Sequence, residues 1–162
     1  MFLKQLIKAA GLCATALTLS MPGARATEKC EPFSLVSNPD KRLVELIDHG
    51  EPGASHGDIR IGYTTMHDAS GSEVGYIRWA VHALGRDENL GNAVIVLETG
   101  QIHLQYMFQP ARPHDDSHST VLTHGTEGIV LGGTGTFAHA DGVFVLTVDG
   151  DSATFDMRLH CD

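Results

Sequence analysis

The sequence predicts an all-β fold, an antiparallel barrel or sandwich of about eight strands, on three observations. Apolar and polar residues alternate with a period of two over most of the chain after Lys41. Turn-forming residues interrupt this alternation at short intervals, and no run shows the 3.6-residue period of an amphipathic helix. At 162 residues the chain has the length of one domain. A barrel fits such a chain because closure of the sheet removes its exposed edges.

Each expected strand is a run of alternating or β-branched residues bounded by Gly, Asp, Asn or Ser. The clearest alternation places four apolar residues on one face of a single strand, namely Ile102, Leu104, Tyr106 and Phe108. In chain order the expected strands are 42–48, 59–68, 73–84, 93–98, 102–108, 120–131, 142–148 and 154–160. The segment 109–119 contains two prolines and several charged residues, and we expect it to be the one long polar loop.

Residues 1–26 have the features of a signal peptide. Lys4 and Lys8 are followed by an uncharged apolar stretch, 9–21, and Ala24-Arg25-Ala26 matches an A-x-A cleavage site. The stretch is shorter than the roughly 20 residues that a membrane-spanning helix needs. We therefore expect cleavage after Ala26, no membrane span, and an exported protein that is periplasmic or secreted.

The net charge limits the classes of partner that the protein can bind, and the cysteine content indicates a disulfide. The net charge is −9, and removal of the expected leader leaves eight basic against twenty acidic residues, which argues against a nucleic-acid or anionic-lipid partner. Cys30 and Cys161 would then be the two remaining cysteines, and in an oxidising compartment they would form one disulfide. That bond would tie an N-terminal segment, 27–40, to a barrel domain, 41–162. A catalytic cysteine is the alternative.

The glycine-rich segment 133–138 matches G-x-G-x-x-A, a pattern found in dinucleotide sites. Such a site needs a helix that begins at the last glycine and holds the pyrophosphate at its N-terminus. Here Gly142 and another alternating run follow within a few residues. We interpret the glycines as a bend between two strands, where backbones crowd or φ is positive. No cofactor is expected.

The chain has ten histidines, and several of them lie together with acidic residues. A metal site is one interpretation, because imidazole and carboxylate groups bind zinc or copper. A solvated loop is the preferred interpretation, because most of the group follows Pro113 in the polar segment, and a Ser–His–Asp triad is disfavoured because adjacent residues do not point at one another. The residues concerned are His103, His114, Asp115, Asp116, Ser117, His118 and His124.

The segment Gly132-Gly133-Thr134-Gly135-Thr136-Phe137-Ala138-His139-Ala140-Asp141-Gly142 resembles the GGTG signature of the allene oxide cyclase and dirigent barrel superfamily. The resemblance extends over about residues 41–160. It implies an eight-stranded antiparallel barrel, often trimeric, that needs no cofactor. In this superfamily an apolar pocket either cyclises an unsaturated epoxy fatty acid or steers the coupling of phenolic radicals.

The resemblance also implies where a site would lie. Glu45 stands at the position of a pocket glutamate of the cyclases, where it would act as a general acid or base. Thr64 and Val81 stand where the cyclases carry an asparagine and a cysteine, and Asp141 stands where dirigent proteins carry an arginine. The resemblance therefore implies the barrel and its pocket more directly than a particular reaction.

Strand parity, taken in the register that the resemblance implies, adds residues that would face the same cavity. Arg60 would bind a substrate carboxylate in a bidentate manner, and Thr64, Trp79 and Tyr106 would contact the substrate. For each of these residues the alternative is an ordinary role: Glu45 and Arg60 in solvent, Trp79 and Tyr106 in the core.

Two classes of function remain open. The first is a secreted, cofactor-independent cyclase or isomerase that folds a small apolar unsaturated substrate into a reactive conformer. The second is a binding barrel that carries an apolar ligand without chemistry, and dirigent-like control of radical coupling is a further alternative. A carboxyl or an arginine converging on the cavity would favour an enzyme.

Overall fold

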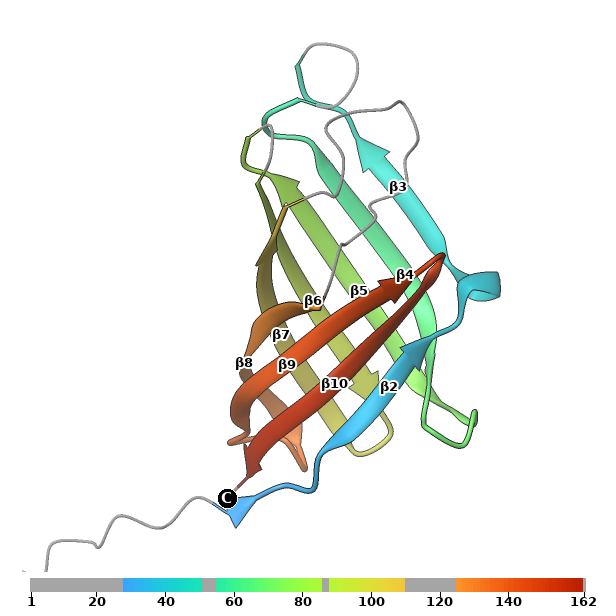
Figure 1. Cartoon of the computed structure of the whole chain (residues 1–162), viewed down its shortest axis with the longest axis vertical. Helices are drawn as coiled ribbons and strands as arrows, with labels where there is room; N and C mark the ends of the chain where they lie inside the picture. Colours follow the sequence, from blue (N-terminus) through green and yellow to red (C-terminus); the bar gives the residue numbers. More distant parts are fainter. Residues whose placement is uncertain (1–27, 51–54, 86–87, 110–124, 162) are drawn as a thin grey trace, which may run out of the picture.

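The structure, a computed structural model, describes residues 28–50, 55–85, 88–109 and 125–161. It is all-β, and eight antiparallel strands close into a barrel because β10 pairs with β9 on one side and with β2 on the other (Figure 1). The predicted fold class is therefore confirmed. The barrel strands are β2 (Phe33–Ser37), β4 (Ile59–His67), β5 (Glu73–Ala83), β6 (Asn89–Leu97), β7 (Gly100–Phe108), β8 (Thr126–Gly135), β9 (Asp141–Asp149) and β10 (Ser152–Cys161).

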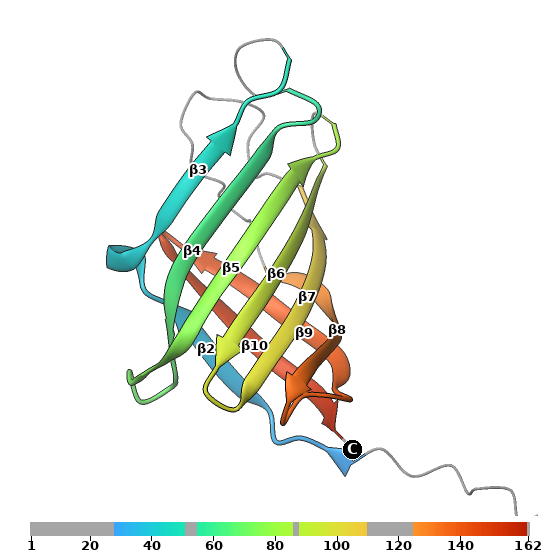
Figure 2. The same cartoon turned by 180° about the vertical axis from the view of Figure 1, so that it is seen from behind.

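Three short elements lie beside the closed barrel. The two-residue strand β1 (Glu28–Lys29) pairs with the end of β10. The 3-10 helix η1 (Pro39–Lys41) connects β2 to β3 (Leu43–Ile47). Both β2 and β3 pair with β4, β2 at its C-terminal end and β3 along its first half, so β3 continues the sheet where β2 leaves it (Figure 2). Within the described ranges no helix is both long and apolar enough to cross a membrane.

The strand that closes the barrel was not among the expected strands. The predicted strand 42–48 corresponds to β3, the extra strand, whereas the closing strand β2 lies inside the segment 27–40. The expected boundary of the barrel domain at residue 41 is thus wrong. The run Phe33-Ser34-Leu35-Val36-Ser37 is short and stands between Pro32 and Pro39, which concealed its alternation.

The GGTG segment forms the end of β8 and the turn into β9, with no helix. Val130 lies opposite Leu104 and Gly132 opposite His103, so Leu131 is the extra residue of a β-bulge. A Cβ at Gly133 would lie 2.1 Å from the carbonyl oxygen of Gln101, and Gly135 has φ +63°. The glycines therefore serve backbone geometry, as the sequence indicated.

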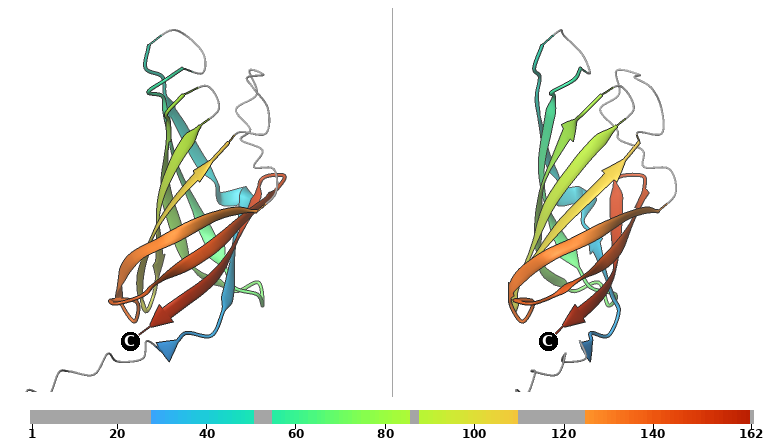
Figure 3. Two further views of the ribbon diagram at one scale, coloured as in Figure 1. Left: turned by 60° about the vertical axis from the view of Figure 1, so that its left-hand side comes forward. Right: turned by 90° about the vertical axis from the view of Figure 1, so that its left-hand side faces the viewer.

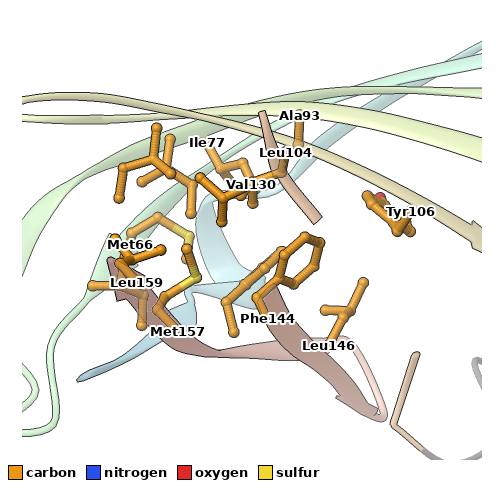
Figure 4. Close-up of a cluster of buried hydrophobic side chains, with 14 of the residues drawn as sticks. Met66, Ile77, Ala93, Leu104, Tyr106, Val130, Phe144, Leu146, Met157 and Leu159 are labelled. Atoms are coloured by element: carbon orange, nitrogen blue, oxygen red, sulfur yellow. The ribbon is translucent and has the colours of Figure 1, made fainter. Parts of the chain in front are cut away.

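Apolar side chains fill one half of the barrel. Several are almost completely buried and come from five strands, namely Met66, Ile77, Ile102, Leu104, Phe144 and Met157. Figure 4 shows Leu104, Val130 and Phe144 packed together, with Tyr106 set further along the barrel. The views in Figure 3 show the ends of β3, β4 and β5 extending past the turn between β9 and β10. Apolar side chains thus fill the barrel at one end, and at the other end some strands extend further than others.

Candidate functional site

The unfilled half of the barrel holds a pocket of about 100 Å³. Its floor belongs to the core, because Ile77, Tyr106, Leu146 and Phe155 are buried in the core cluster and also line the pocket. The remaining lining residues come from β2, β4, β5, β7, β9 and β10, from the connection between η1 and β3, and from the β9–β10 turn: Ser37, Arg42, Arg60, Thr64, Trp79, Val81, Phe108, Val148, Asp151 and Ala153. The site therefore combines apolar walls with polar groups.

Two aromatic walls lie flat against glycines on neighbouring strands. Trp79 pairs with Gly62, and a Cβ at Gly62 would lie 2.0 Å from Cζ2 of the indole. Tyr106 pairs with Gly91 in the same way, and a Cβ there would lie 2.3 Å from Cζ of the phenol ring. A side chain at either glycine would push the ring toward the interior. The glycines therefore keep the pocket open.

Tyr106 places a polar tip in an otherwise apolar wall. Its ring stacks on Phe108 at 5.7 Å and meets the edge of Phe144 at 5.9 Å, so the ring position is fixed. Burial raises the pKa of Tyr106 to about 12, so the hydroxyl keeps its proton at neutral pH. Burial alone accounts for this shift, with no contribution from a hydrogen bond. The hydroxyl can therefore donate to a ligand.

Arg42 and Asp151 form a charged pair at the rim. Nη1 of Arg42 lies 3.6 Å from Oδ1 of Asp151, and the guanidinium carbon lies 6.0 Å from the centre of the Trp79 ring. The Asp151 side chain is 81% exposed and that of Arg42 is 32% exposed. An exposed pair at this distance contributes little to stability. Neither residue was among the predicted site residues.

The polar side chains deeper in the site are held by the protein itself. Thr64 Oγ1 donates to the carbonyl oxygen of Asn38 at 2.6 Å, and Ser37 Oγ accepts from the backbone N–H of Ala153 at 2.7 Å. These bonds fix the junction of β2 and η1. Thr64 thus has its proton committed and can offer a ligand only an acceptor.

The predicted site residues divide into two groups. Arg60, Thr64, Trp79 and Tyr106 all line the pocket, so the structure brings these four together. Arg60 lies on β4 opposite Val81, another lining residue. Their roles toward a substrate remain predictions.

The expectation that Glu45 points into the pocket is wrong. Glu45 is exposed and lies opposite Ile61, whereas the inward residues of β4 lie opposite Val44 and Leu46. Residues directly opposite in an antiparallel pair share a face, so Glu45 is on the outer surface. Apolar residues occupy both faces of β3, which is why alternation alone did not identify the inner one.

The two cysteines lie near each other along the paired ends of the chain. Glu28 is opposite Cys161, and the backbone N–H of Cys30 donates to the carbonyl oxygen of Leu159 at 3.1 Å. Cys30 packs partly buried against the core. The Cys161 side chain is outside the described residues, so the disulfide stays a prediction.

The histidine group is mostly outside the described part of the chain. This applies to His114, His118 and His124 and to the acidic residues near them, whereas His103 lies on β7. Among the described residues, no group of three His, Cys, Asp or Glu side chains is placed to hold a metal ion.

Comparisons with known proteins show the fold. No family model matches the chain, and no curated protein matches it in sequence. A pyocyanin demethylase is similar at TM-score 0.61 and 21% identity, over 80% of this chain and 99% of that one. The Diels–Alderase AbmU from Streptomyces koyangensis is similar at TM-score 0.56 and 12% identity, over 79% of this chain and 62% of that one.

A dirigent protein, a pterocarpan synthase, is also similar, at TM-score 0.56 and 13% identity, over 92% of this chain and all of the other. These likenesses show the fold alone, and together with the closed sheet of this chain they confirm the barrel that the GGTG resemblance implied. At these identities the comparisons leave the chemistry of the pocket to be argued from its residues.

Proposed function

We propose that this protein is an exported, cofactor-independent cyclase or isomerase that acts on a small, largely apolar, unsaturated molecule. The observation that carries the proposal is the pocket itself, an opening of about 100 Å³ with aromatic walls that glycines hold back from the interior. Export is supported by the features of residues 1–26. The similar structures are named for demethylation, Diels–Alder and pterocarpan chemistry, which supports a barrel of this type as a container for reactions.

The pocket would act mainly by positioning. Trp79 on one strand and Phe155 on another provide flat apolar surfaces that line the same space. A flexible unsaturated chain held between such surfaces loses its extended conformers and keeps folded ones in which its ends meet. Holding reacting groups together in this way can remove several kcal/mol from a barrier, roughly 7–11 kcal/mol in the best intramolecular cases.

Tyr106 would supply the polar contribution that Glu45 does not. Its hydroxyl is protonated and faces a low-dielectric space, so a hydrogen bond to a carbonyl oxygen that gains negative charge is strong there. Arg60 and Thr64 line the same pocket and would bind polar atoms of the substrate. In this arrangement the protein orients the substrate and stabilises charge, and no strong base is required.

A non-catalytic binding barrel is the second candidate. The observation that favours it is that Thr64 and Ser37 use their hydroxyl groups within the protein, which leaves much of the lining apolar. Such a lining suits a carrier of an apolar ligand as well as an enzyme.

Trp79 offers a direct test, because it is the single tryptophan of the chain and lines the pocket. Binding of a conjugated ligand should change the fluorescence of Trp79. Native mass spectrometry of the protein purified from its source should show the mass of the bound molecule. For an enzyme, candidate substrates are recovered as an isomer or cyclised product, and Tyr106→Phe slows turnover by about tenfold or more while binding stays within a few-fold. Recovery of unchanged ligand from saturated protein favours the carrier. Absence of any fluorescence change and of any bound mass contradicts both candidates.

A further inference from the structure

We propose that the ligand is a planar, conjugated molecule with a carboxylate or similar anionic group, and that Arg42 binds this group at the mouth of the pocket. This inference rests on the proposed function and names the substrate class of the same site. It is carried by the unequal exposure of Arg42 and Asp151, their loose pairing, and the position of Arg42 over Trp79.

The first observation is the difference in exposure between the two charged side chains at the rim of the pocket. The Asp151 side chain is the more exposed member of the rim pair, at 81% against 32% for Arg42, so water screens its charge more strongly. At the mouth of the pocket, the Arg42 guanidinium is therefore the less screened of the two charges, and an incoming anion is attracted to it.

The second observation is that the protein already places a carboxylate beside Arg42. The Arg42–Asp151 distance of 3.6 Å is longer than the roughly 2.7–2.9 Å of a charge-assisted hydrogen bond. A guanidinium binds a carboxylate best through two parallel N–H donors, which this pairing does not reach. A ligand carboxylate can displace Asp151, whose exposed side chain then returns to water at little cost. Asp151 thus acts as an internal competitor for the anion site.

The third observation links the anion to a flat molecule. The Arg42 guanidinium lies 6.0 Å from the centre of the Trp79 ring, so a carboxylate on Arg42 starts next to the indole. A conjugated body attached to it would then lie along Trp79, toward the protonated hydroxyl of Tyr106. An acceptor such as a carbonyl oxygen at the far end of the ligand fits that hydroxyl.

The backbone that carries Arg42 is firmly held. The Arg42 N–H donates to the carbonyl oxygen of Pro39 at 3.2 Å, and the Asn38 side chain accepts from the N–H of Asp40 at 3.0 Å. Asn38 is in turn held by Thr64 through the bond of 2.6 Å. The backbone position from which the Arg42 side chain extends is therefore set before a ligand arrives, which lowers the entropic cost of binding.

The test compares matched acids and amides by isothermal titration calorimetry on the exported protein. Suitable pairs are trans-cinnamate and cinnamamide, 1-naphthoate and 1-naphthamide, and sorbate and sorbamide. Members of a pair have nearly the same shape and differ in charge at neutral pH. We expect the acid of at least one pair to bind about tenfold more tightly than its amide, and this preference to shrink as salt is added.

Two variants with matched controls locate the preference. Arg42→Gln should weaken acids about tenfold and leave amides unchanged, and Asp151→Asn should strengthen acids about threefold or more because the competitor is gone. Arg158→Gln and Asp149→Asn make the same charge changes at exposed positions outside the pocket lining, and they should have less than a twofold effect.

The outcomes separate this inference from the proposed function. Binding of amides as tight as that of acids, or an acid preference that Arg42→Gln leaves intact, overturns the anion site while the pocket remains a ligand site. Absence of binding by every compound, acid and amide, overturns the proposed function and this inference together.

Discussion

An alanine at position 62 should close the pocket while the barrel remains folded. The added Cβ would lie 2.0 Å from Cζ2 of Trp79, whereas ordinary contact begins at 3.4 Å, so the indole must move by roughly 1.4 Å. The pocket is the open side of the ring, so the ring can move there without displacing backbone. We expect a loss of ~1 kcal/mol in the free energy of unfolding, at the low end of the range for over-packed sites.

The effect on binding should be much larger than the effect on stability. The methyl group and the displaced indole together occupy a substantial part of a pocket of only about 100 Å³. We therefore expect the affinity for any planar ligand to fall by at least tenfold, or ~1.4 kcal/mol. Urea unfolding gives the stability, and calorimetric titration of the folded protein gives the affinity.

Gly133→Ala is the matched control, because the obstacle there is backbone. Its Cβ would lie 2.1 Å from the carbonyl oxygen of Gln101 on the neighbouring strand, which cannot rotate away. We expect a loss of ~3 kcal/mol in stability and no change in the affinity of the folded fraction. If Gly62→Ala destabilises the protein as much as Gly133→Ala, or leaves ligand affinity unchanged, Trp79 is not the movable wall that the structure describes.

Three further predictions follow from the same structure. Glu45→Gln should change neither stability nor ligand turnover measurably, because its carboxylate lies in solvent on the outer face; a loss of turnover above about tenfold would restore Glu45 to the site. Burial tends to raise the pKa of Asp58, but hydrogen bonds from Ser55 and from the backbone of His49 outweigh this effect and lower the pKa. The ionised Asp58 carboxylate therefore stabilises the fold at pH values above its ordinary pKa of 3.8. This stabilisation is lost as the pH falls through the lowered pKa. Asp58→Asn should therefore lower stability most at neutral pH and least in acid, as measured by urea unfolding across this range; an equal loss at all pH values would argue against the assignment. If the chain is exported, mass measurement of the protein without reductant should show a Cys30–Cys161 bond and an N-terminus after Ala26, and two alkylated thiols would exclude the bond.

The sequence predicted most of the barrel because each strand is a local pattern. Runs such as Ile102–Phe108 alternate over their whole length, and that alternation needs no information about neighbours. The strand β2 is only five residues long and contributes two inward side chains that are buried, Leu35 and Ser37. Its place in the barrel comes from pairing with β10, more than a hundred residues away, which local alternation does not report.

The site was predicted in part, and the division has a physical cause. Arg60, Thr64 and Trp79 were assigned together because the resemblance implied which strand parity faces inward, and strand pairing keeps these residues on that face of β4 and β5. Glu45 failed because β3 carries apolar residues on both faces and is covered on neither: Leu43 is 68% exposed and Val44 48%. On an extra strand at the rim, hydrophobic pattern and inward direction are no longer linked.

Arg42 shows why a rim site escapes sequence reasoning even when the fold is known. Its place over Trp79 depends on η1, a single turn held by a hydrogen bond from Thr64, and its counterion comes from the β9–β10 turn. Neither turn has a residue pattern that points to the other. The glycines opposite Trp79 and Tyr106 are different, because strand register alone pairs them with the aromatic rings. Given a strand pairing, an inward aromatic residue opposite a glycine thus marks a wall that lies flat, and in this barrel two such walls outline the space that a planar ligand would occupy.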